Sequence, residues 1–438
     1  MNNKILREVP EKRERYTKHF QMNEKGMAAA VYSVPIHYEE DGTWKEIDNR
    51  LESAVKDGKS VYQNRASQVH VSFAEQAGDE ALVSVERAGR CLSWRLETEP
   101  SVSVQAAAQQ TDGMGAEAGA LKPAGRFRVL TEPEFPKFPE ELKKEAKEQP
   151  AEVSDGAESG EQIQLHAGTT QEDETQISEM MCVPHLASEG MYEDILPDVD
   201  LHYTIEGERI KENIRLKTRE AAGLPLKFHF THAGMVMKKE ADGSLALYDT
   251  EEAGVRKTDE NCEPVYTLAK PYMYDQNGEI SQAAEFGLET EGGESFVSMI
   301  LDAAWLQDEQ RAYPVVIDPR TETSKSSANI EDTYIFPGTT NCDDAESAYA
   351  FGSFLVGKAT GNGNNRALLR FKNLPDIGKG SILYAATMYI WQYEYSSYGV
   401  AKIPLMAYEI TGNWAEKTAR WKNQPPTDGK VLDYKEVS

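Results

Sequence analysis

The chain has 438 residues, of which 39% are hydrophobic, and this is enough to bury the cores of two or three domains. Its formal net charge of -26 argues against nucleic acid and anionic membrane surfaces as partners, because like charges repel. The sequence also has no apolar run of about 18 residues, the length that membrane insertion as a helix requires.

Residues 1–20 are strongly charged and lack the apolar stretch of a signal peptide. Either another export route or a start further upstream would account for this, and we expect the chain to be a fragment of a longer protein. The four cysteines, Cys91, Cys182, Cys262 and Cys342, show no zinc-ligand spacing. Isolated thiols and a single disulfide both fit their spacing, so disulfide pairing stays open.

Residues 28–104 read as short β-strands separated by turn residues. Residues 28–38 favour one strand, residues 40–42 (EDG) a turn, and residues 44–49 an alternating strand. Further strands are predicted over residues 69–73, 81–85 and 91–96. Alternation of this kind is typical of an antiparallel sheet with one buried face.

Residues 105–175 are rich in Ala, Glu, Gln, Gly, Ser and Pro and poor in aromatic residues. Such a composition buries too little apolar surface to offset the entropy of ordering the chain. We therefore predict a flexible, disordered insert within the first domain.

The β-pattern resumes at residue 177 and continues to about residue 320. Residues 201–205, 227–231 and 296–301 alternate, and residues 314–319 (PVVIDP) are predicted to close the domain. After a linker at residues 321–328, short strands return at 333–336, 367–371, 383–391 and 403–410, and the pattern is still running at 431–437.

The predicted fold class is therefore all-β, in four parts. A charged N-terminal segment (1–27) precedes a large β-sandwich-like domain (28–320), and after the linker a partial jelly-roll-like β-sandwich (329–438) is expected to be truncated at its C-terminus.

Three ordered motifs resemble the N-terminal region of RHS/YD-repeat and wall-associated polymorphic-toxin-like proteins of Firmicutes. They are residues 37–51 (HYEEDGTWKEIDNRL), residues 192–214 with YEDILPDVDLHY and IKENI, and residues 305–319 ending in YPVVIDP. The resemblance implies a secreted or cell-wall-associated protein whose C-terminal RHS or toxin region lies outside this chain. No YD repeat and no toxin domain is present in the sequence itself.

The last part of the chain resembles a DNRLRE domain, a type grouped with carbohydrate-binding modules. The matching pieces are residues 332–335 (DTYI), 366–371 (RALLRF) and 414–425 (WAEKTARWKNQP). This resemblance implies that a polysaccharide or cell-wall glycan is a partner.

No catalytic motif is present: the sequence lacks a GxSxG elbow, an HExxH helix, a Walker loop and a dinucleotide GxGxxG. A glycosidase carboxylate pair is defined by spatial separation, which sequence does not reveal. His37 and His202 lie in β-runs and are expected to be structural. Asn49 and Asp318 are expected to support turns, as Asp48 is, because their side chains cap local backbone groups.

Two features suggest ligand sites in the last domain. Trp391, Tyr393 and Tyr395 follow Tyr389 at a period of two, so these rings would share one face of a strand and either stack on sugars or belong to the core. The second feature is an acidic group that would hold calcium or remain solvated surface charge, comprising Asp332, Asp343, Asp344 and Glu346.

We therefore expect a non-catalytic segment that binds a polysaccharide or cell-wall glycan and holds a larger secreted protein at a surface. Two alternatives remain open at this point. One is a purely structural cap or spacer of an RHS shell, and the other is a polysaccharide-degrading enzyme. Exposed aromatic rings on a sheet face would favour glycan binding, and a deep cleft with paired carboxylates would favour the enzyme.

Overall fold

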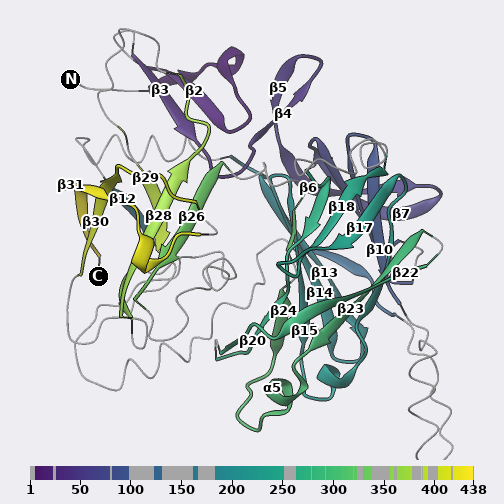
Figure 1. Cartoon of the computed structure of the whole chain (residues 1–438). Helices are drawn as coiled ribbons and strands as arrows, with labels where there is room; N and C mark the ends of the chain where they lie inside the picture. The colour runs from purple at the N-terminus through teal and green to yellow at the C-terminus, as the bar shows by residue number, and fades with distance from the viewer. Residues whose placement is uncertain are drawn as a thin grey trace, which may run out of the picture. The chain divides into compact units, whose positions relative to one another are not determined.

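The computed structural model describes residues 5–22, 26–78, 81–97, 123–130, 161–165, 183–250, 263–277, 279–291, 293–318, 320–322, 329–337, 356–359, 363–376, 386, 388–392, 403–415 and 418–437. The chain forms two compact units, drawn in Figure 1. Unit 1 comprises residues 1–33, 149–182 and 328–438, and unit 2 comprises residues 34–148 and 183–327.

Unit 2 contains a sheet that has eight strands within the described residues, all of them antiparallel to their neighbours. The central strands β9 and β10 bury alternate residues, as the sequence pattern predicts, whereas β8 buries four residues in a row at its end. In spatial order the strands are β22 (Ala284–Glu291), β23 (Glu294–Leu301), β16 (Lys227–Thr231), β10 (Arg90–Leu96), β9 (Val83–Arg87), β8 (Val69–Ala74), β7 (Lys59–Ala66) and β6 (Asp48–Lys56).

The second sheet of unit 2 has eleven strands in the part of the chain that is described. Its main path runs β11 (Phe127–Leu130), β13 (Ala187–Leu196), β14 (Val199–Glu206), β15 (Arg209–Leu216), β25 (Arg320–Glu322), β19 (Tyr266–Leu268), β18 (Leu245–Asp249) and β17 (Met235–Lys239). The strands off this path are β20 (Tyr272–Tyr274), β21 (Ile280–Ser281) and β24 (Val315–Asp318).

The two sheets face each other across one hydrophobic core, so unit 2 is a β-sandwich and the predicted all-β class is confirmed. Phe73 of the first sheet and Tyr203 of the second lie with ring centroids 5.1 Å apart. The Tyr192 hydroxyl donates hydrogen bonds to the carbonyl oxygens of Ala74 and Leu82, at 2.7 and 3.0 Å. These bonds satisfy the polar end of a fully buried ring and join the sheets.

Part of the predicted flexible insert belongs to this sandwich, which corrects the expectation. Residues 127–130 form β11, paired with β13, and Phe127 is buried against Phe73 with ring centroids 4.5 Å apart. One large aromatic ring supplies enough apolar contact to order a segment whose surrounding composition is polar. Residues 161–165 also form a strand, β12 (Glu161–Leu165) of unit 1. The rest of the insert lies outside the described residues.

A β-hairpin of β4 (His37–Glu40) and β5 (Thr43–Glu46) precedes the first sheet. Asp41 and Gly42 form its turn with φ of 51° and 72°, a conformation that Asp, Asn and Gly tolerate best. The motif continues into β6, where Asp48 does cap the backbone N–H of Arg50, at 3.1 Å.

Asn49 plays a different part from the predicted turn residue. It is fully buried, and its amide nitrogen donates to the carbonyl oxygens of Leu186 (2.7 Å) and Gly207 (2.9 Å). Its amide oxygen accepts from the side chain of Asn64, at 3.0 Å. Asn49 therefore joins distant backbone segments of unit 2, because a buried amide must satisfy its hydrogen bonds.

Unit 1 is built from both ends of the chain. The N-terminal part gives the antiparallel strands β1 (Ile5–Glu8), β2 (Thr17–Met22) and β3 (Met27–Val31). The remaining described strands are β12, introduced above, and β26 (Ile330–Ile335), β27 (Gly357–Ala359), β28 (Gly363–Phe371), β29 (Met388–Gln392), β30 (Ile403–Ile410) and β31 (Thr427–Val437).

Helical structure is short in the described residues. It comprises α5 (Ala303–Gln307) and the 3-10 turns η1 (Pro10–Lys12), η3 (Ala221–Gly223) and η5 (Trp421–Asn423). None of the described helices has the length and apolarity needed to cross a membrane.

Candidate functional site

Two arginines on one face of β28 lie over two tryptophans of the segment before β31. The guanidinium carbon of Arg366 is 4.9 Å from the centroid of the Trp421 ring, and that of Arg370 is 4.7 Å from the Trp414 ring. Both distances are within the range of a cation–π interaction. Leu368 lies between the arginines on the same face and is buried with Ile335 and Ala419.

Hydrogen bonds fix both guanidinium groups. Arg370 donates to the carboxylate of Glu331 (2.8 Å) and to the carbonyl oxygen of Trp414 (2.9 Å). Arg366 donates to the side-chain oxygen of Gln424, at 2.6 Å. The motifs RALLRF and WAEKTARWKNQP therefore pack against each other. The guanidinium groups of Arg366 and Arg370 stabilise this contact.

The sheet of β30 and β31 exposes a group of large apolar side chains. Met406 and Tyr434 are directly opposite each other in the register, and Tyr408 lies two residues from Met406 on the same strand. The exposed fractions are 46% for Met406, 43% for Tyr408 and 63% for Tyr434. The Tyr408 hydroxyl lies 3.4 Å from the sulfur of Met406, so these two side chains are in contact.

These three residues form what we call the tyrosine platform: Met406, Tyr408 and Tyr434. Val431 and Leu432 are exposed next to it on β31. Contiguous exposed apolar side chains of this kind mark interaction sites in soluble proteins. The sequence interpretation missed this platform, although the period-two spacing of Met406 and Tyr408 is the same signal that drew attention to residues 389–395.

The predicted aromatic stripe is only partly covered by the described residues. Trp391 lies in β29 and pairs with Gln162 of β12, but its side chain is outside the described part of the structure. Tyr393 and Tyr395 also lie outside it. The proposed role of these three rings stays a prediction.

The predicted calcium group has one described member. Asp332 is half-buried on β26, opposite Leu369 of β28. Asp343, Asp344 and Glu346 lie outside the described residues, so calcium binding by this group stays a prediction.

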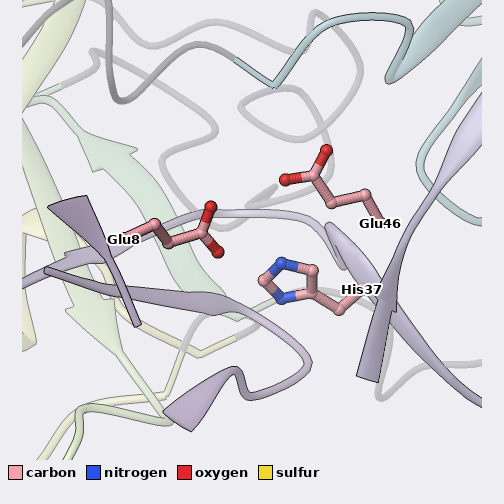
Figure 2. Close-up of side chains that lie close together, drawn as sticks. All are labelled: Glu8, His37 and Glu46. Atoms are coloured by element: carbon pink, nitrogen blue, oxygen red, sulfur yellow. The ribbon is translucent and has the colours of Figure 1, made fainter. Parts of the chain in front are cut away.

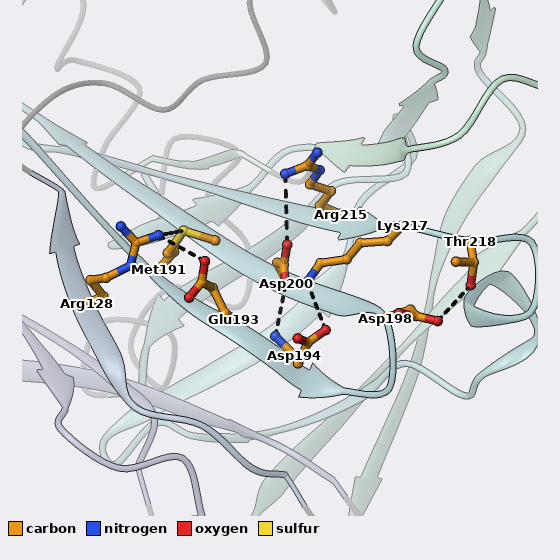
Figure 3. A network of polar contacts seen from close by, with 9 residues as sticks. All are labelled: Arg128, Met191, Glu193, Asp194, Asp198, Asp200, Arg215, Lys217 and Thr218. Atoms are coloured by element: carbon orange, nitrogen blue, oxygen red, sulfur yellow. Dashed lines mark hydrogen bonds and ion pairs between the residues drawn. The ribbon is translucent and has the colours of Figure 1, made fainter.

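The motif residues of unit 2 form a polar network on the face of the second sheet that points away from the core (Figure 3). Lys217 contacts Asp194 (2.8 Å) and the buried Asp200 (2.7 Å), and Asp200 also accepts from the backbone N–H of Asp194 (2.9 Å). Partial burial lowers the pKa of Lys217, but the hydrogen bonds to both carboxylates outweigh it and leave the pKa raised. The acidic motif at residues 192–203 is therefore held by cations of its own sheet.

Asp318 lies in a strand and not in a turn, which corrects the sequence interpretation. It ends β24, is 2% exposed, and its carboxylate lies 2.7 Å from the ammonium group of Lys211. The Tyr272 hydroxyl donates to the same carboxylate, at 2.8 Å. A carboxylate this deeply buried needs such partners, so the YPVVIDP motif closes the sandwich through an ion pair.

His37 and Glu46 face each other across the β4–β5 hairpin as direct cross-strand partners (Figure 2). His37 is fully buried and Glu46 is half-buried. Glu8, also drawn there, belongs to unit 1, in which its carboxylate accepts a hydrogen bond from Arg13 at 2.6 Å.

A buried carboxyl group lies in the sandwich core, where Glu212 accepts a hydrogen bond from the Tyr203 hydroxyl. Burial raises the pKa of Glu212 to about 7. Perturbed acids are frequent at active sites, but they also occur in structural networks. The surroundings of Glu212 and Tyr203 are the apolar core residues Leu201, Ile210 and Ile214 on the same two strands, which favours a structural role.

Comparison with known families adds one assignment. Residues 323–437 match carbohydrate-binding module family 96. The C-terminal part of the chain is therefore a carbohydrate-binding-type module, and the tyrosine platform and both arginine–tryptophan pairs lie inside the matched range. No solved structure matches the chain.

Among curated proteins, the chain is similar to three Bacillus nucleases. It is 26% identical over 256 residues to the tRNA(Glu)-specific nuclease WapA of Bacillus subtilis subsp. natto, covering 55% of this chain and 10% of that protein. The tRNA nuclease WapA of Bacillus subtilis strain 168 gives 26% over 255 residues, with the same coverage. The tRNA3(Ser)-specific nuclease WapA of Bacillus spizizenii gives 26% over 256 residues. The aligned part of the chain thus spans about a tenth of the length of these relatives.

Proposed function

We propose that this chain is a non-catalytic attachment segment, which binds a polysaccharide or cell-wall glycan and holds a larger secreted bacterial protein at a surface. The observation that carries the proposal is the tyrosine platform, because it places two exposed aromatic rings on a sheet face within a carbohydrate-binding-type module.

The chemistry of the platform suits sugars. A tyrosine ring presents a flat apolar face that packs against the C–H face of a pyranose, and its hydroxyl reaches the hydroxyl groups at the sugar rim. Met406 lies opposite Tyr434 and beside Tyr408, and its flexible thioether adapts to rings of different shape. An open platform without deep walls would bind an extended polymer and not enclose a small molecule.

The relatives do not assign an activity to this chain. Their printed names describe tRNA nucleases, but the matched region is about a tenth of each protein. A nuclease activity of those proteins therefore does not transfer to this chain. The strongly acidic chain also disfavours tRNA as a ligand here. An extracellular or cell-wall location, with an RHS-type region following, agrees with the motifs of residues 37–51 and 192–214.

A non-catalytic role is supported by the state of the ionisable groups in the described residues. Among the buried carboxylates of the described residues, Asp200, Asp275 and Asp318 are each ion-paired, and Glu212 lies in the apolar core. General acid–base catalysis requires such groups within reach of a bound substrate.

The test uses the full chain and insoluble polysaccharides. Cellulose, chitin, xylan and purified peptidoglycan sacculi would be incubated with the wild type and with Tyr408→Ala, Tyr434→Ala and the double variant. We expect the wild type to sediment with at least one polymer and the double variant to lose about tenfold or more in affinity. Leu374→Ala, at an exposed apolar residue of the same unit, is the matched control.

Equal sedimentation of the double variant and the wild type would show that the platform is not the binding site. Release of reducing sugar by the wild type would contradict the non-catalytic part of the proposal. Thermal melts of all variants check the fold, and exposed positions should leave the melting temperature nearly unchanged.

A further inference from the structure

The outer face of the first sheet of unit 2 carries a straight row of small hydroxyl side chains. Ser72 pairs with Ser84, Ser84 with Ser93, and Ser93 with Thr231, so the row crosses β8, β9, β10 and β16 at one register. The neighbours of these residues on each strand are buried in the core. Because side chains alternate along a strand, the row points away from the core. We call it the hydroxyl row.

A second row runs beside it and is made of larger groups. Arg95 pairs with His229, and His229 pairs with Phe296 of β23. The His229 and Phe296 rings are stacked, with centroids 4.6 Å apart and planes 12° apart. The ammonium group of Lys227 lies 5.3 Å from the centroid of Phe296. A planar, partly apolar surface therefore borders the row of small side chains.

The side chains of the hydroxyl row are small and those of the second row are large, and a hollow of about 310 Å³ lies between the two rows. Its lining is polar at the sides and has the core residue Trp94 at its base, and comprises Ser93, Trp94, Arg95, His229, Thr231 and Glu294. The hollow spans β10, β16 and Glu294 of β23, and Ser84 of β9 lies directly opposite Ser93 at its edge. We call the hollow together with Ser84 the trough; it covers four strands, roughly 14 Å at the usual strand spacing. Ser72, at the end of the row, is buried and is not part of the trough.

The charges around the trough are balanced. The cations Arg95 and Lys227 are matched by the carboxylates of Glu294 and Glu289, and Lys227 lies 2.7 Å from the carboxylate of Glu289. Neither an anionic nor a cationic polymer would gain from this arrangement. The hydroxyls, the guanidinium and the carboxylate instead offer mixed donors and acceptors, and the stacked rings offer an apolar face. A ligand that is neutral, rich in hydroxyl groups and partly apolar on its ring faces matches all of these features.

We infer that this trough is a second glycan-binding site, which takes a neutral oligosaccharide laid across the strands. Its ring faces pack against the His229–Phe296 stack, and its hydroxyl groups bond to Ser84, Ser93, Thr231 and Arg95. The site lies in unit 2, outside the residues that match the carbohydrate-binding module family, and it does not depend on the tyrosine platform. Two sites on one chain would raise the apparent affinity for a polymer that carries many copies of the ligand.

The experiment uses the full chain carrying Tyr408→Ala and Tyr434→Ala, so that the platform does not contribute. Cellohexaose, chitohexaose and maltohexaose are titrated into it by isothermal calorimetry. We expect binding of at least one of them, weakened about tenfold or more by Ser84→Arg, which fills the trough, and by Phe296→Ala, which removes the stack. Ser60→Arg, at an exposed serine of the same sheet, is the matched control and should bind normally.

Two results would overturn the inference. The first is no heat of binding for any of the three sugars with the platform variant. If the wild type still binds glycan in that case, the proposed function stands and only the second site is lost. The second is unchanged affinity in both Ser84→Arg and Phe296→Ala when their melting temperatures match that of the parent.

Discussion

The guanidinium of Arg370 stacks on the Trp414 ring and donates a hydrogen bond to the carbonyl oxygen of the same tryptophan. The Arg370 side chain therefore contacts both the ring and the backbone of Trp414. Since Arg370 also pairs with Glu331, it connects three chain segments of the module: β26, β28 and the loop before β31. In the described part of the module, Ile335, Leu368 and Ala419 form an apolar cluster, against which Ile410, Trp414 and Trp421 pack, and Arg370 covers one edge of it through Trp414.

Replacing Arg370 should therefore destabilise the module. We expect Arg370→Ala to lower its free energy of unfolding by about 2 kcal/mol through the lost stacking and hydrogen bonds. Arg370→Lys should recover less than half of this, because lysine lacks the planar fork. Urea unfolding followed by tryptophan fluorescence measures the effect. Lys372→Ala, at an exposed residue beyond the end of the same strand, serves as the control. Equal stability of Arg370→Ala and Lys372→Ala would contradict the prediction.

Gly190 should tolerate no larger residue. A Cβ atom there would overlap the Phe127 ring, with Cζ closest and Cε1 at 2.6 Å. Phe127 stacks on Phe73 and cannot withdraw without opening the core. We expect Gly190→Ala to destabilise unit 2 by about 3 kcal/mol. Gly223→Ala is the matched control, since nothing lies within 4 Å of its added Cβ. Chemical denaturation that finds both variants within error of the wild type would disprove this account of the close packing.

Glu212 should make the stability of unit 2 depend on pH. Its pKa is raised from 4.5 to about 7, so between these values the folded state keeps a proton that the unfolded chain has released. The free energy of unfolding then falls as pH rises through this window. The contribution is fully present below about pH 4.5 and is lost above about pH 7, on the order of 3 kcal/mol.

Glu212→Gln keeps an acceptor for the Tyr203 hydroxyl but cannot ionise. We expect the variant to lose this pH slope and to be more stable than the wild type at pH 8. Denaturant unfolding at pH 5, 6, 7 and 8 measures both, with the exposed Glu291→Gln as the control. An identical pH profile for Glu212→Gln and the wild type would rule out the buried carboxyl as the cause.

Local patterns were sufficient to predict many strands. Residues 201–205 lie within β14, residues 227–231 coincide with β16, and residues 296–301 lie within β23. Each alternates apolar and more polar residues with a period of two, because one face of each strand packs in the apolar core. The predicted strand at residues 28–38 is instead divided between β3 and β4, with Pro35 in the gap. Proline has no N–H to donate to a ladder, and this limits strand continuity.

Contacts between residues far apart in the sequence could not be predicted from local sequence patterns. Composition placed Phe127 in a flexible insert, and only its stacking on Phe73 shows why its segment is ordered. Asn49 is a residue type that is common in turns, but its hydrogen-bond partners are the carbonyl oxygens of Leu186 and Gly207, more than a hundred residues away. Likewise, the sequence does not show which aromatic side chains of a β-run are exposed. The sequence analysis therefore selected residues 389–395 as a ligand site and did not select Tyr408 or Tyr434.

The joining of the two chain ends in unit 1 has a consequence for synthesis. The amide group of buried Asn329 donates to the carbonyl oxygen of Tyr32, 297 residues earlier, and its backbone N–H donates to Ser33. A ribosome adding 5–20 residues per second needs roughly 15–60 s to reach the second partner. Tyr32 and Ser33 thus wait for Asn329 while the sandwich between them is synthesised. The contact that joins the two parts of unit 1 therefore forms only after the chain of unit 2 has been made.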